Sequence, residues 1–102
     1  DSGLSSLYLV FSRPLGGDHR YHQPPISLPA FPDAQLAPSK TYVQGGGKKR
    51  RRWKDSAGKI YEWDSQHGTV ELYSKQGKHL GEYDPETGRQ TKPENPARKV
   101  EK

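Results

Sequence analysis

Three short segments that are typical of strands most constrain how this chain can fold, and the middle one alternates polar and apolar residues. They span residues 59–64, 69–74 and 79–84, and they are separated by turns at 65–68 and 75–78 that each contain a glycine. Alternation over five or six residues is typical of half-buried strands, and such short turns favour hairpins. The sequence therefore predicts an antiparallel meander, followed by a turn at 84–88 and an edge strand in the basic tail 89–102.

Apolar residues are scarce, so the predicted sheet has little with which to build a core. Only 28% of residues are hydrophobic, and the mean hydropathy is −1.15. Alternation assigns Val70 and Leu72 to the core and leaves Glu71 exposed beside Tyr73. Because aliphatic residues are so few, we expect Trp63 in the core as well. We expect a mainly β fold: a small, strongly twisted antiparallel sheet with an extended proline-rich N-terminal segment and at most one short helix.

The N-terminal part has a different composition, which suggests a domain boundary. Residues 13–40 hold six of the nine prolines, a density that excludes regular helix, and Gly45, Gly46 and Gly47 read as a hinge. Residues 4–12 are the most apolar stretch and resemble a strand. We interpret 1–44 as a linker or the end of a preceding domain and 45–102 as the functional domain. A chain starting near Gly45 should then keep its activity.

The net positive charge is confined to the predicted functional domain. Residues 1–44 carry three basic and three acidic residues, whereas 45–102 carry fourteen and nine, the whole net charge of +5. Six of the seven residues from 48 to 54 are basic, with Trp53 among them. Clustered charge, with Trp53 expected to stack on RNA bases, favours nucleic-acid binding over a merely solvated surface or a localisation-type signal. The absence of cysteine excludes disulfide scaffolds and thiolate metal sites.

The first predicted hairpin, residues 59–74, gathers side chains suited to RNA cleavage. It places Asp64, His67 and Glu71 near Tyr73, beside the basic surface. Cleavage needs one group to take the proton of the 2′-hydroxyl and another to protonate the leaving oxygen, which a carboxylate and an imidazole can do without metal. On spacing alone, His67 is more often an ordinary loop residue.

A metal site is disfavoured at the same hairpin. His67 and Glu71 would align only on a helix, and Gly68, Thr69 and Val70 are poor helix residues. His19 and His22 form a sparse pair in the proline-rich segment. We therefore expect neither metal nor cofactor, and no stable membrane association, since no run approaches the roughly 20 apolar residues of a membrane span.

An ordered set of motifs resembles one family of bacterial toxins. From about Gly45 to Arg98 the chain carries KIYEWDSQHG, then a Glu and a Tyr, then HLG and a DP-x-TG turn. This set resembles the cytotoxic ribonuclease domain of the 16S rRNA-cleaving E-type colicins (the colicin E-three type), a module also found in S-type pyocins and contact-dependent inhibition toxins. The resemblance implies a twisted antiparallel sheet and metal-independent cleavage of 16S ribosomal RNA at the decoding site.

The resemblance also assigns residues and partners. Asp64, His67 and Glu71 match the catalytic positions. Four residues would bind substrate: Tyr61, Tyr73, Lys92 and Arg98. Six residues would contact RNA or an immunity protein: Lys48, Lys49, Arg50, Arg51, Arg52 and Lys54. The implied partners are 16S rRNA in the 30S subunit or 70S ribosome and an acidic cognate immunity protein. The domain would be secreted within a larger toxin, with residues 1–44 ending its translocation domain, and would act in the cytoplasm of the target bacterium. The competing interpretation is a non-catalytic RNA- or ribosome-binding module.

Overall fold

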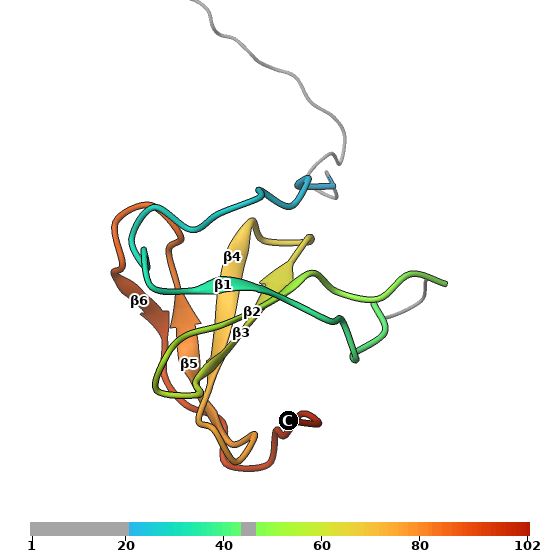
Figure 1. Ribbon diagram of the computed structural model, residues 1–102, viewed down its shortest axis with the longest axis vertical. Helices are drawn as coiled ribbons and strands as arrows, with labels where there is room; N and C mark the ends of the chain where they lie inside the picture. Colours follow the sequence, from blue (N-terminus) through green and yellow to red (C-terminus); the bar gives the residue numbers. More distant parts are fainter. Residues whose placement is uncertain (1–20, 44–46) are drawn as a thin grey trace, which may run out of the picture.

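The computed structural model describes residues 21–43 and 47–102 and has the predicted mainly β fold (Figure 1). Six strands form one antiparallel sheet, and their order in space follows their order in sequence. They are β1 (Gln35–Ala37), β2 (Arg52–Lys54), β3 (Ile60–Asp64), β4 (Thr69–Tyr73), β5 (His79–Tyr83) and β6 (Gln90–Lys92). The apolar stretch 4–12 and most of the glycine hinge lie outside the described residues.

The short helix that the sequence allowed is not found in residues 21–43 or 47–102. The search for a helix long and apolar enough to cross a membrane, made over the same residues, found none.

The three predicted central strands are confirmed, and β6 is the predicted edge strand. Two turn glycines adopt positive φ angles, 70° at Gly68 and 89° at Gly77. Residues other than glycine rarely adopt these angles, so the turn positions are encoded locally.

One face of the sheet carries the core. Val70, Leu72 and Trp63 pack there as predicted, with Trp53 and Tyr61 beside them. Trp53 is fully buried and its Nε1 donates to the carbonyl of Ile26 at 2.9 Å. The expectation that Trp53 is free to stack on RNA bases is therefore wrong.

The proline-rich segment also contributes to this core. The interpretation of residues 21–43 as a linker is therefore corrected. Leu28 and Ala34 are buried in the core cluster. The Trp63 Nε1 donates to the carbonyl of His22 at 2.7 Å, and β1 extends the sheet by pairing with β2. Prolines prevent a helix here, but they do not prevent an extended chain from covering an apolar sheet face.

Candidate active site

The face opposite the core carries an in-register row of charged residues. Arg52 lies opposite Glu62, Glu62 opposite Glu71, Glu71 opposite Glu82, and Glu82 opposite Lys92, so the row runs from β2 to β6. Like charges directly opposite each other destabilise a sheet. Here each of the three carboxylates has its own polar partners, and the middle one lies in a cleft.

Asp64 and His67 form the first pair of predicted site residues, at the β3–β4 turn. The imidazole Nδ1 lies 2.8 Å from Asp64 Oδ2, while Asp64 Oδ1 accepts from the backbone N–H groups of Gln66 and His67 at 2.9 and 3.1 Å. Burial raises the pKa of Asp64, but these hydrogen bonds outweigh it and hold the pKa below the usual 3.8. Asp64 is therefore charged at neutral pH, and its stabilising contribution is lost only as pH falls through that lowered pKa.

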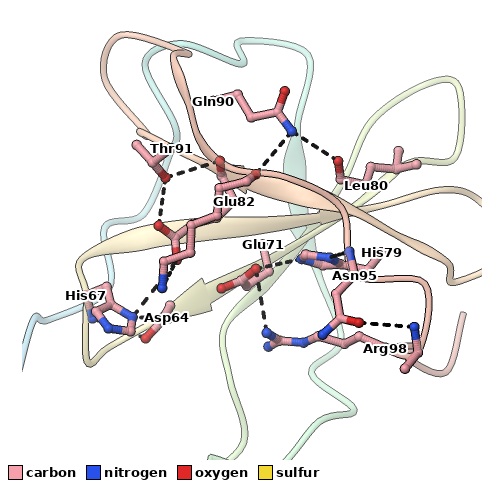
Figure 2. Close-up of polar contacts among 12 residues, drawn as sticks. Asp64, His67, Glu71, His79, Leu80, Glu82, Gln90, Thr91, Asn95 and Arg98 are labelled. Carbon is pink, nitrogen blue, oxygen red and sulfur yellow. Dashed lines mark hydrogen bonds and ion pairs between the residues drawn. The ribbon is translucent and has the colours of Figure 1, made fainter.

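Glu71 is held at the centre of the row by two basic side chains (Figure 2). Its Oε1 lies 2.8 Å from His79 Nε2 and 3.7 Å from Arg98 Nη1. The backbone N–H of Asn95 donates to His79 Nδ1 at 2.9 Å, so the neutral ring carries its proton on Nε2 and donates it to Glu71. Only 3% of Glu71 is exposed. The prediction that Glu71 is exposed is wrong, because the chain from Asn95 to Arg98 returns over this face.

The sequence interpretation missed His79 and Glu82, and a β-bulge explains why. Strict alternation would put residues three apart on opposite faces of β5. The register shifts between Leu72 and Tyr73, so that Tyr73 pairs with His79 and Glu71 with Glu82. Gly81, at φ 142°, accommodates the irregularity. A glycine inside an alternating segment was the available signal.

Glu82 completes the cleft from the β6 side. Its Oε2 accepts from Thr91 Oγ1 at 2.7 Å, whereas Oε1 faces Lys92 Nζ at 3.9 Å and His67 Nδ1 at 4.0 Å. The resulting cleft has a volume of about 410 Å³, and its polar lining includes Asp64, His67, Glu71, His79, Glu82, Lys92 and Arg98. One concave site thus combines carboxylates, imidazoles and cations, which can move protons and neutralise a phosphate.

Comparison with known proteins shows the family to which the chain belongs. Residues 22–101 match the family model described as Cytotoxic. The chain belongs to the Cytotoxic family. It is 46% identical to Colicin E3 and 44% identical to Colicin-E6 of Escherichia coli, each over 82% of this chain and 16% of the relative. It is 55% identical to Cloacin of Escherichia coli over 62% of this chain and 12% of the relative. The chain therefore spans less than a fifth of the length of each of these relatives.

The two tyrosines expected at the site lie on different faces of the sheet. Tyr73 is fully buried below the cleft, edge-on to His79 with 5.2 Å between ring centroids, and burial raises its pKa to about 12. Tyr61 faces the core, donates to Asp55 Oδ2 at 2.7 Å and packs on Phe31. The structure does not bring Tyr61 to the cleft, because β3 alternation places it on the face opposite Asp64.

The basic run does not form one uniform surface. Lys48, Lys49 and Lys54 are exposed, Arg50 is half-buried, and Arg51 Nη1 donates to the carbonyl of Pro25 at 3.1 Å. Arg52 is 1% exposed and its Nη2 lies 2.6 Å from Glu62 Oε2, which also accepts from Thr41. The expectation that Arg52 contacts RNA or an immunity protein is therefore wrong.

Replacing Arg52 with alanine is expected to lower the free energy of unfolding by about 3–5 kcal/mol, because Glu62 would stay buried without its cation. Denaturant unfolding followed by tryptophan fluorescence measures the loss. The Lys54→Ala variant is the matched control: it removes an exposed cation from the same strand and should change stability by no more than about 0.5 kcal/mol. A similar small loss for both variants would show that the buried ion pair contributes nothing.

A larger hollow of about 790 Å³ lies elsewhere, between residues 22–29 and the 84–87 turn. In the part of the chain that the structure describes, its lining includes Asp84 and Glu86 but no lysine or arginine. A phosphate backbone would be repelled there, so the smaller cleft with its cations is the better candidate site.

Proposed function

We propose that this chain is the ribonuclease domain of a bacteriocin-type toxin, and that it cleaves 16S ribosomal RNA at the decoding site and so stops translation. The observation that carries the proposal is the cleft in which the Asp64–His67 pair, Glu71 and Arg98 meet, in a chain of the Cytotoxic family. The ordered KIYEWDSQHG motif supports the E-type colicin activity in particular.

Glu71 is the general base of the proposed reaction. It takes the proton of the 2′-hydroxyl, whose oxygen attacks the adjacent phosphorus, and the product is a 2′,3′-cyclic phosphate. Its Oε1 is occupied by His79 and Arg98, which leaves Oε2 as the accepting oxygen. The cleft buries the carboxylate among cations, so the substrate phosphate is neutralised where the base acts.

His67 is the general acid. Asp64 holds Nδ1 and compensates the charge of the protonated ring, so Nε2, on the opposite edge, can donate to the departing 5′-oxygen. The ring is partly exposed, with 46% of the side chain accessible, so it can reach a bound strand. Arg98 and Lys92 would neutralise phosphate oxygens. The reverse assignment, with His67 as base and Glu71 as acid, uses the same two groups.

We expect one discrete cut in 16S RNA when intact ribosomes are treated with this domain, and no loss of activity in EDTA. Primer extension locates the cut. The 5′ fragment should end in a 2′,3′-cyclic phosphate, since the neighbouring hydroxyl is the nucleophile. A plain 3′-hydroxyl end would refute this mechanism. Intact RNA with a protected footprint would support the non-catalytic binding module instead.

The proposed partners follow from the target and the charge. The substrate is 16S rRNA in the 30S subunit or the 70S ribosome. A producing cell needs an inhibitor, and a domain with net charge +5 suits an acidic cognate immunity protein, whose capture would be accelerated by opposite charge. Exposed Lys48, Lys49 and Lys54 are candidate contacts. The parent toxin would be secreted, and this domain would act in the cytoplasm of the target bacterium.

A further inference from the structure

The β3–β4 turn, which carries Asp64 and His67, also contributes to a group of atoms that suits a transition metal. One ligand atom from each of Asp64, His67 and Glu82 lies within 4.8 Å of the other two. The central atom is the imidazole Nδ1, at 2.8 Å from Asp64 Oδ2 and 4.0 Å from Glu82 Oε1. We propose that Zn²⁺ binds to Asp64, His67 and Glu82 and reversibly inhibits the domain.

Each of the two carboxylates has one oxygen held by hydrogen bonds, and its other oxygen faces His67 Nδ1. Asp64 Oδ1 is held by two backbone N–H groups, and Glu82 Oε2 is held by Thr91 Oγ1. Carboxylates at metal sites are oriented by hydrogen bonds of this kind to their outer oxygens. Among residues 21–43 and 47–102, Glu82 Oε1 makes two long ionic contacts, with Lys92 and His67, so it is available to an ion.

The donor types and the spacing favour zinc. One imidazole nitrogen and two carboxylate oxygens are ordinary Zn²⁺ ligands, at about 2.0–2.2 Å from the ion, and three protein ligands leave one position for water. Two atoms that ligate one tetrahedral Zn²⁺ lie roughly 3.3 Å apart. Asp64 Oδ2 must therefore move back from its 2.8 Å contact with His67 Nδ1, and Glu82 Oε1 must approach Nδ1 from 4.0 Å. The Lys92 ammonium opposes a cation here, but 59% of its side chain is exposed, so it can turn into solvent.

Metal binding would disable the proposed catalyst. The ion displaces the proton from His67 Nδ1 to solvent and takes the place of the hydrogen bond to Asp64. The ring then keeps a single proton, on Nε2, and cannot cycle between protonated and neutral forms, so the leaving oxygen loses its proton donor. Because a proton must leave, Zn²⁺ binding should weaken as pH falls.

Isothermal titration calorimetry with zinc chloride tests the site without reference to activity. We expect one Zn²⁺ per chain. Glu82→Gln and His67→Ala should each lower the affinity by more than the roughly 10–100-fold that follows loss of an outer hydrogen-bond partner. Glu86→Gln and His22→Ala remove an acid and an imidazole outside the set and should bind as the wild type does. Absence of binding, or equal affinity in all four variants, would overturn the site.

The inhibitory effect rests on the proposed function and is measured separately. Ribosome cleavage should slow as Zn²⁺ approaches the calorimetric Kd and recover when EDTA is added. Calorimetric binding with undiminished cleavage would overturn the inhibition. A domain that binds zinc at this set but never cuts RNA would refute the proposed function and leave the metal site standing.

Discussion

The Glu71→Gln variant should lose about 10²–10⁴-fold of the rate of ribosomal RNA cleavage, the usual contribution of one general acid or base. Glutamine keeps the shape of the side chain and can still accept the hydrogen bond from His79 Nε2, but it cannot take a proton. The domain should therefore remain folded while the 2′-hydroxyl goes unactivated. Single-turnover cleavage of 70S ribosomes measures the rate, and near-ultraviolet circular dichroism checks the fold.

The His67→Ala variant should show a loss of the same order, since the leaving oxygen would go without its proton donor. The matched control is Glu86→Gln, which neutralises an exposed carboxylate outside the cleft and should cleave as the wild type does. Wild-type rates for Glu71→Gln or His67→Ala would remove that residue from the mechanism. Equal losses in Glu86→Gln would mean that overall charge, and not the cleft, decides the rate.

A chain that starts at Gly45 should fail to fold, and should be inactive for that reason. It loses β1, the buried Leu28 and Ala34, and the carbonyl acceptors of both tryptophans. Removing one buried leucine side chain alone costs about 2–5 kcal/mol, and a small domain has about 5–15 kcal/mol of stability in total. Thermal unfolding followed by far-ultraviolet circular dichroism would reveal the loss.

The control for this truncation is a chain that starts at residue 22, where the family match begins. It keeps the segment that covers the sheet and should unfold cooperatively. If the chain that starts at Gly45 instead folds and cleaves ribosomal RNA, residues 22–44 are not needed for folding or activity, as the sequence analysis expected.

Local patterns in the sequence were enough to determine the hairpins. The alternation in β3 and β4 is a property of neighbouring residues, and it assigns Val70 and Leu72 to one face and Glu71 to the other whatever the rest of the chain does. Turn glycines such as Gly68 and Gly77 then bring sequence neighbours together, which is why Asp64 and His67 could be paired from the sequence. The resemblance to a toxin family rested on the same segment.

The remaining features depend on contacts between segments far apart in the sequence, so only the tertiary structure decided them. Glu71 is buried because the chain near Arg98 returns over β4, and Arg52 is buried because Glu62 and Thr41 meet it. The bulge in β5 moves His79 to the face that carries the cleft, against simple alternation. The sheet has one apolar face that must be covered, and no helix among the described residues covers it. The proline-rich segment packs on this face and so becomes part of the core.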